Sequence, residues 1–126
     1  MKVTQPNQIP WLNDKGEVFR HYEEWYTFRN YNKDMRVILT LETAGMKDDF
    51  NYYNRPPFPV HWARMQGKGR VMYTALGHFN EFWEDANWMK FFGDCFAWIL
   101  RDYNMDMTPN IDQVTPGAFV VPRQSL

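Results

Sequence analysis

His78 is the residue whose neighbours in the sequence point most directly to chemistry, because it follows a predicted strand and a glycine, Gly77. Ligands of α/β folds gather at such strand ends. A histidine ring exchanges a proton near neutral pH, and a nearby carboxylate can orient it. We therefore predict an acid–base pair of His78 and Glu24, beside which Gly77 leaves room for a ligand to approach.

Two other roles for His78 stay open. Metal ligation needs further ligands, and no HxH or HExxH motif accompanies this residue. Alternatively, Gly77 and His78 only cap, by hydrogen bonding, the loop that leads into the next helix. The sequence assigns no metal and no cofactor. His21 is predicted to lie on the surface.

A β-hairpin is predicted to lead to His78. Residues 59–66 and 70–76 both alternate with a period of two, so that neighbours such as His61 and Trp62 point to opposite faces. The turn Gly67-Lys68-Gly69 supplies two glycines for the positive φ values of a short loop. It lacks the GxxxxGK[ST] spacing of a phosphate-binding loop.

Two further strands are predicted upstream. Residues 17–30, if extended, place Glu24 and Tyr26 on one face and Glu23 and Trp25 on the other. Residues 35–42 are nearly continuously apolar and rich in β-branched side chains, which is typical of a strand buried on both faces. The polar segment that follows, residues 43–58, is predicted to be a surface loop long enough to belong to a binding site.

One amphipathic helix is predicted after Asp85, whose side chain can accept hydrogen bonds from the free amides of the first turn. Its apolar arc would cover a sheet and contains Trp88, Phe91, Phe92, Cys95, Phe96, Trp98 and Ile99. Cys95 is the only cysteine and so cannot form an internal disulfide. No activating base accompanies it, and we predict that its thiol packs in the core.

Composition limits the classes of function. A length of 126 residues corresponds to at most one ordinary domain. With a net charge of −1 and scattered basic residues, a nucleic-acid partner is not expected. No apolar run approaches the length of a membrane span. The first residues lack the apolar core of a secretory signal. Localisation is therefore cytoplasmic if the chain is complete, and export is open if an N-terminal part is missing.

Six short motifs, taken together, resemble the C-terminal half of ThuA-like domains, the trehalose-utilisation family. In order, they are Glu23-Glu24-Trp25-Tyr26 with Phe28, Arg36-Val37-Ile38-Leu39-Thr40, Pro59-Val60 with Trp62, Gly67-Lys68-Gly69-Arg70-Val71, Tyr73-Thr74 with Leu76-Gly77-His78, and residues 92–98 with Trp98. Order and spacing agree over roughly residues 20–100. Two positions depart from the family pattern: Glu23 stands where Asp is usual, and His61 where Ala is frequent.

The resemblance implies the C-terminal half of a three-layer α/β/α domain, similar to glutamine amidotransferases and flavodoxin-like folds, with a β-hairpin followed by an amphipathic helix. It divides the chain into an N-terminal arm (1–16), a partial ThuA-like domain (17–102) and an extended C-terminal tail (103–126). One helix and one hairpin would cover only one face of the strand at 35–42. We therefore expect a homo-oligomer or association with the missing N-terminal half.

The resemblance also implies a role in the metabolism of trehalose or oxidised sugars. Aromatic faces can stack on sugar rings, and carboxylates accept hydrogen bonds from hydroxyl groups. Substrate-binding candidates are Trp25, Tyr26, His61, Trp62 and Gly77, beside the catalytic candidates Glu24 and His78. Two classes stay open, a sugar-active enzyme or part of one, and a non-catalytic carbohydrate-binding or interaction module.

Overall fold

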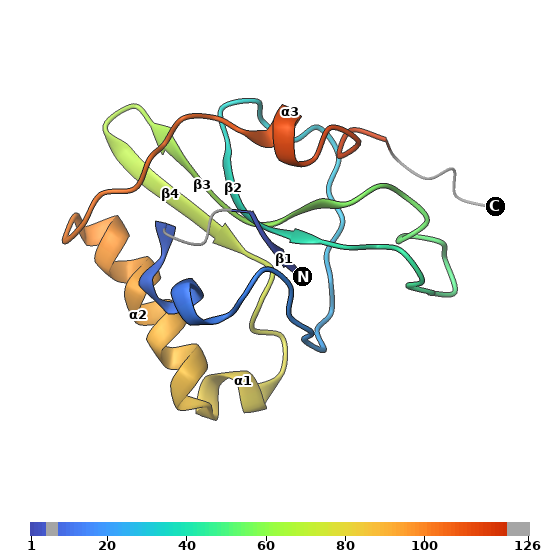
Figure 1. Ribbon diagram of the computed structural model, residues 1–126, viewed down its shortest axis with the longest axis horizontal. Helices are drawn as coiled ribbons and strands as arrows, with labels where there is room; N and C mark the ends of the chain where they lie inside the picture. The colour runs from blue at the N-terminus through green and yellow to red at the C-terminus, as the bar shows by residue number, and fades with distance from the viewer. Residues whose placement is uncertain (5–7, 121–126) are drawn as a thin grey trace.

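The computed structural model describes residues 1–4 and 8–120, which form a four-stranded antiparallel sheet with helices packed around it (Figure 1). The strands are β1 (Lys2–Val3), β2 (Arg36–Leu41), β3 (Phe58–Gln66) and β4 (Gly69–Thr74), in that spatial order. The predicted mixture of α and β structure is confirmed. Every pairing is antiparallel, so the described residues do not show the three-layer arrangement built on a parallel sheet.

The hairpin and the strand before it were predicted correctly. β3 and β4 pair from His61 opposite Thr74 to Gln66 opposite Gly69, and Gly67 in the turn has φ of +57°. All the residues of β2 are buried. A shift in register between Val37 and Leu39 marks an irregularity where β2 pairs with β3.

The predicted helix is α2 (Ala86–Leu100). Asp85 caps it, because its Oδ1 accepts hydrogen bonds from the backbone N–H groups of Asn87 at 2.7 Å and Trp88 at 3.3 Å. Phe91, Cys95 and Trp98 are the fully buried residues of the helix. Phe96, which the sequence pattern assigned to the apolar arc, is 59% exposed. A short helix that was not predicted, α1 (Asn80–Glu84), precedes α2.

Cys95 packs as predicted. Its side chain is buried in the core, and burial, with a smaller contribution from Asp94, raises the pKa of the thiol to about 12. A thiol in this environment stays protonated and unreactive at neutral pH.

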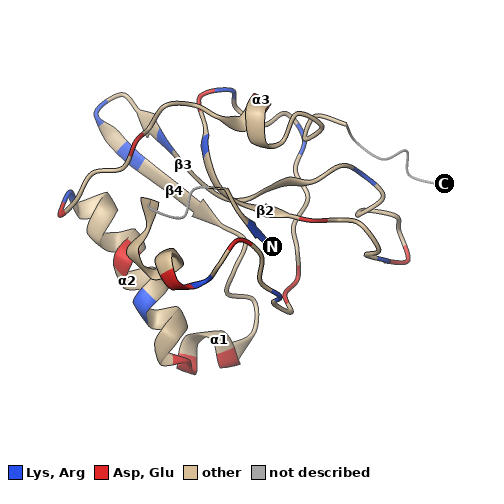
Figure 2. Cartoon of the chain, viewed as in Figure 1, with Lys and Arg blue, Asp and Glu red and all other residues tan. Residues whose placement is uncertain are grey.

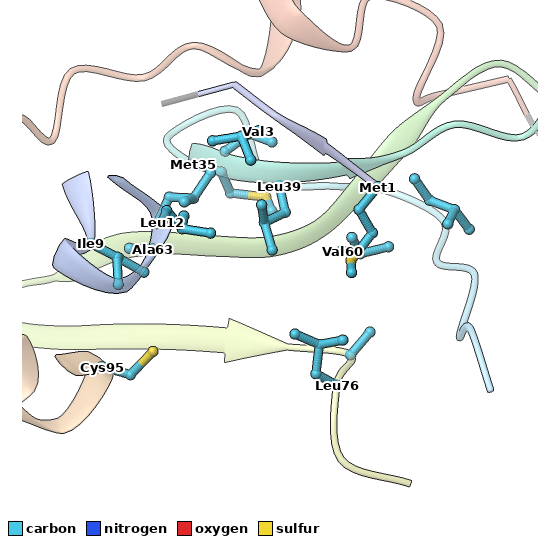
Figure 3. Packing of buried hydrophobic residues seen from close by; sticks show 14 of the residues in the cluster. Met1, Val3, Ile9, Leu12, Met35, Leu39, Val60, Ala63, Leu76 and Cys95 are labelled. Atoms are coloured by element: carbon cyan, nitrogen blue, oxygen red, sulfur yellow. The ribbon is translucent and has the colours of Figure 1, made fainter. Parts of the chain in front are cut away.

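The N-terminal stretch contributes to the core rather than extending away from it. In Figure 3, Val3 lies beside Met35, and Ile9 and Leu12 lie near Ala63. Ile9 and Leu12 have no exposed surface. The 3-10 helix η2 (Pro10–Asp14) supplies Trp11 and Leu12 and packs on α2. The backbone N–H of Trp11 donates to Asp94 of α2 at 2.8 Å, which fixes this contact.

Residues 17–30 do not form the predicted strand. Among the described residues, their only ladder contact is an isolated bridge between Val18 and Lys2. Instead, this segment is held largely through side chains: Tyr53 Oη donates to the carbonyl of Trp25 at 3.0 Å, and Arg55 donates to the carbonyl of Phe28 at 3.1 Å. Side-chain bonds remove the need for the strict alternation that the strand prediction assumed.

The C-terminal segment covers β2. Residues 103–120 contain the short helix α3 (Ile111–Val114), and residues 121–126 of the predicted tail lie outside the described part of the chain. Arg36 reaches this segment, donating to the carbonyl of Thr108 at 2.8 Å and pairing with Asp106 at 2.9 Å. Our reason for expecting association was an uncovered face of β2, and the chain itself supplies that cover. Association stays a prediction.

Charged side chains of both signs are interspersed along the described chain (Figure 2). The exclusion of a nucleic-acid partner stays a prediction. No helix in residues 1–4 and 8–120 combines the length and hydrophobicity needed to cross a membrane.

Asn110 replaces a neighbouring strand at the edge of β2. Since β1 has only two residues, its backbone does not pair with Val37, and only the hydroxyl of the next residue, Thr4, donates to the Val37 carbonyl, at 2.9 Å. The Asn110 side chain completes the edge: Oδ1 accepts from the Val37 N–H at 2.7 Å, and Nδ2 donates to the Val37 carbonyl at 3.0 Å. Without Asn110, the buried N–H would lose its bond in a dry site, whereas the carbonyl would keep its bond from Thr4.

We predict that Asn110→Ala lowers the free energy of unfolding by about 1–3 kcal/mol, because the buried N–H of Val37 loses its partner while the Val37 carbonyl keeps its bond from the Thr4 hydroxyl. Chemical denaturation measures this change. Asn32→Ala is the control, since the Asn32 side chain is exposed and, among the described residues, accepts one bond, of 3.3 Å, from the backbone N–H of Asp34. Equal stability of the two variants would show that the Asn110 contacts do not hold the C-terminal segment on β2.

Candidate functional site

The two predicted catalytic residues are in contact. Nδ1 of His78 lies 2.8 Å from Oε2 of Glu24, and the two side chains are 47% and 51% exposed. His78 belongs to the loop that connects β4 to α1, whereas Glu24 comes from the irregular segment 17–30 (Figure 1). Because Glu24 engages Nδ1, Nε2 is the ring nitrogen left for proton exchange with a ligand. The geometry permits acid–base chemistry, and the catalytic roles stay predictions.

Glu23 holds the backbone on both sides of this pair, a role that the sequence pattern did not predict. Its side chain has no exposed surface, and its carboxylate accepts the backbone N–H of Gly77 at 2.7 Å and that of His78 at 3.2 Å. It also accepts the N–H of Glu24 at 2.9 Å. Strand alternation had placed Glu23 away from Glu24. Since the segment is not a strand, both carboxylates reach residues 77–78.

Position 77 requires a glycine, both for its backbone conformation and because Trp83 lies against it. Its φ is +117°, and a Cβ atom built on it would lie 3.0 Å from Cζ2 of Trp83. The indole Nε1 of Trp83 donates to the Gly77 carbonyl at 2.9 Å. The side of Gly77 that was expected to admit a ligand is therefore filled by Trp83. Contact between the Gly77 backbone and a substrate stays a prediction.

The aromatic candidates are divided between two environments. Tyr26 is 54% exposed and lies beside the pair, its hydroxyl 3.5 Å from Oε2 of Glu24. Trp25 is buried and belongs to the core. Trp62 stacks on Tyr73 with ring centroids 5.3 Å apart. Tyr26 is thus the one predicted aromatic residue that directly contacts the acid–base pair.

His61 is fully buried and packs 5.0 Å from the ring of Phe91 in α2. Burial lowers its pKa to about 3, opposed in part by the backbone of Tyr73. The Tyr73 contact is not a well-formed hydrogen bond, and neither ring nitrogen has one within the described residues. The imidazole therefore behaves as a neutral core group. It gives no support to the substrate-binding role predicted for His61, which stays a prediction.

The prediction that His21 lies on the surface is wrong. Its ring packs 4.6 Å from Trp88 and 5.9 Å from Phe82, and Nε2 lies 3.7 Å from the carboxylate of Glu23. Desolvation lowers the pKa of His21, and the negative charge of Glu23 opposes the shift. His21 is therefore part of the packing beneath the site.

A cavity opens beside Glu24. It has a volume of about 450 Å³ and is lined by Glu24, Trp25, Tyr26, Thr27, Phe28, Tyr52 and Tyr53. We call it the Glu24 cavity. The predicted loop 43–58 supplies the two tyrosines of the far wall. A larger hollow of about 690 Å³ lies within that loop and shares Tyr53, but neither Glu24 nor His78 lines it.

Within residues 1–4 and 8–120, no cluster of three or more His, Cys, Asp or Glu side chains could hold a metal ion.

These features define a class: a mixed α/β protein in which a carboxylate of the irregular segment 17–30 pairs with an imidazole on the loop after the edge strand. The particular family follows from comparison with known proteins. The chain belongs to the ThuA family, described as trehalose utilisation, whose family model matches residues 2–99. Comparisons with curated proteins and with solved structures found no match.

We predict that Glu23→Gln lowers the free energy of unfolding by about 2–3 kcal/mol, because an amide cannot replace a buried carboxylate that accepts three backbone N–H groups. Amide exchange at Gly77 and His78 should also become faster. Denaturation and hydrogen exchange measure the two effects. Glu17→Gln is the control, since that side chain is 76% exposed and should change stability by less than about 0.5 kcal/mol. Unchanged exchange at residues 77–78 would contradict the role given to Glu23.

We predict that His61 makes the protein less stable in acid. Its pKa is about 3 in the folded chain, against 6.5 for an ordinary histidine, so between these values the unfolded chain binds a proton that the folded chain does not. The free energy of unfolding then falls as pH decreases from about 6.5 toward 3, by up to about 1.4 kcal/mol per pH unit.

Denaturation curves of His61→Leu between pH 4 and pH 8 test this expectation. The variant should show a shallower pH dependence than the native chain. Val60→Ala, a change at a neighbouring buried position, should lower stability equally at all pH values. A native-like slope in His61→Leu would show that the buried imidazole does not titrate as we expect.

Proposed function

We propose that this ThuA-family chain acts on a sugar of trehalose or oxidised-sugar metabolism, with Glu24 and His78 as its acid–base pair. Membership of the family associates the chain with trehalose utilisation. The observation that carries the proposal is the 2.8 Å contact between His78 Nδ1 and Glu24 Oε2, half exposed and beside the Glu24 cavity. A buried pair would be explained by structure alone, whereas this one is open to a ligand.

The geometry supports proton transfer by His78. With Nδ1–H donating to Glu24, Nε2 carries the lone pair and can take a proton from a sugar hydroxyl group or an acidic C–H group. The ring then becomes an imidazolium, and the Glu24 carboxylate stabilises its charge. The buried Glu23 holds the backbone of residues 77–78, so the ring is positioned before a substrate arrives.

The cavity walls suit a sugar ring. Tyr26 and Tyr52 are partly exposed and present flat faces on which the C–H surface of a sugar can pack. The Glu24 carboxylate can accept hydrogen bonds from hydroxyl groups. The cavity's volume of about 450 Å³ lies within the range of small-molecule sites.

The alternative function is a non-catalytic carbohydrate-binding or interaction module. One observation favours it: Glu23 and Trp83 already satisfy the backbone around Gly77, as they would if this loop were only a structural cap. In this case Glu24 and His78 contribute to binding, and no reaction follows.

We predict that His78→Ala lowers turnover of the sugar substrate by about 10²–10⁴-fold while the fold is kept, because the general base is lost. Glu24→Gln should lower turnover less, since the ring remains but loses its orienting charge. Trehalose and its oxidised derivatives are the substrates to test.

Glu17→Gln is the matched control, because Glu17 also forms an exposed ion pair, at 3.5 Å with Lys2. It should leave turnover unchanged. Full turnover by a folded His78→Ala protein would refute the assignment. Sugar binding by the native chain without turnover would instead support the module.

A further inference from the structure

A third hollow lies on the side of the hairpin where Trp62 and Tyr73 stack, and we call it the arginine hollow. It has a volume of about 360 Å³, and its lining includes Phe28, Tyr31, Trp62 and Tyr73, with Arg29 and Arg64. Neither the acid–base pair nor the proposed chemistry uses it.

The walls of the arginine hollow are aromatic. The rings of Trp62 and Tyr73 are nearly parallel, at 22°, with centroids 5.3 Å apart. Phe28 meets Tyr73 edge-on at 5.2 Å, which places a third ring at the corner of the stack. Such walls offer flat apolar faces to a sugar ring, and a volume of about 360 Å³ is at the lower end for ligand sites.

The charge of the arginine hollow is positive. Arg29 is exposed, and no ion pair of Arg29 occurs in the part of the chain that the structure describes. Arg64 is 3.6 Å from Asp34, a long contact that leaves its guanidinium able to bind a stronger partner. None of the described residues that line the hollow is acidic. Guanidinium groups bind carboxylates and phosphates through paired N–H donors.

The arginine hollow adjoins the Glu24 cavity. Phe28 lines both. Tyr26, whose hydroxyl contacts Glu24, also lies near Tyr73: burial raises the pKa of Tyr73 to about 12, and Tyr26 adds to the shift. One ligand could therefore extend from the acid–base pair, past Tyr26 and Phe28, to the two arginines.

We propose that the arginine hollow binds the carboxylate or phosphate group of an anionic sugar, whose other part reaches Glu24 and His78. The aromatic walls would hold the ring that bears the anion, and Arg29 and Arg64 would hold the anion itself. The reach toward Glu24 and His78 rests on the proposed function, but anion selectivity in the hollow does not. The substrate class is thereby narrowed from sugars in general to sugar acids or sugar phosphates.

Calorimetric titration of the whole chain tests this proposal, with three disaccharide probes: trehalose, trehalose 6-phosphate and the uronic acid of trehalose, in which one C6 is a carboxylate. The native chain should bind at least one anionic probe about tenfold or more tightly than trehalose, the scale of one charge-assisted hydrogen bond. The tighter of the two anionic probes identifies the anion as phosphate or carboxylate.

Arg29→Gln and Arg64→Gln should each remove most of this preference while trehalose binding is unchanged. Arg20→Gln is the matched control, an exposed arginine that lines neither hollow, and it should keep the preference. Glu24→Gln should keep it as well, because the anion binds away from the acid–base pair. Circular dichroism verifies that each variant is folded.

Three results would overturn the proposal: equal affinity for all the disaccharides, a preference that survives in both hollow variants, or inorganic phosphate binding as tightly as trehalose 6-phosphate, which would leave the aromatic walls without a role. Failure of the proposed function is a separate result. If the anion preference depends on Arg29 and Arg64 but no probe is turned over, the anion site in the arginine hollow is supported and the acid–base assignment is refuted.

Discussion

The complete burial of β2 is the constraint on which the rest of this structure depends. Six consecutive buried residues need cover on every side, and only one long helix is available among the described elements. Irregular segments therefore cover much of β2, as helices cover strands in larger domains. The N-terminal residues enter the core, and Asn110 continues the edge of the sheet through its side chain. Such segments are anchored by single side chains and fixed at a few points, and Glu24, one of the two proposed catalytic residues, lies on one of them.

The neighbours Glu23 and Glu24 have identical side chains but lie in different environments. Glu23 is withdrawn from water and bound by backbone N–H groups, whereas Glu24 is half exposed and faces an imidazole. A buried carboxylate is tolerated only when its oxygens are satisfied, and the strand end at Gly77 and His78 provides those donors. The first residue thus fixes the place of the second. The residue that positions the site and the residue proposed to react are thus neighbours in the sequence.

The parts of the fold that could be predicted from the sequence are those with a regular period. β2, the hairpin and α2 with its Asp85 cap follow from local patterns, and the resemblance to the ThuA family is confirmed by the family match. The contact of Glu24 with His78 was also expected. The strand predicted at residues 17–30 was wrong, because the carbonyls of this segment accept hydrogen bonds from side chains distant in sequence, such as Tyr53 and Arg55. No local sequence pattern indicates such bonds. The same error misplaced Glu23 and hid the burial of His21. The sequence signal that could have indicated a buried carboxylate is the pair Glu23-Glu24 directly before the aromatic pair Trp25-Tyr26.

The attachment of segment 17–30 has a dynamic consequence. Backbone hydrogen bonds join Glu17 and Phe19 to residues 3 and 1, but residues 20–30 are fastened by side chains, so this part can separate from the sheet without breaking any strand pair. Opening of this kind is a local event whose free energy lies below that of global unfolding. It must also break the bonds that Gly77 and His78 donate to the buried carboxylate of Glu23, which join the segment to the loop after β4. The site can come apart and reassemble while the sheet stays folded, and a ligand that contacts both parts would hold them together.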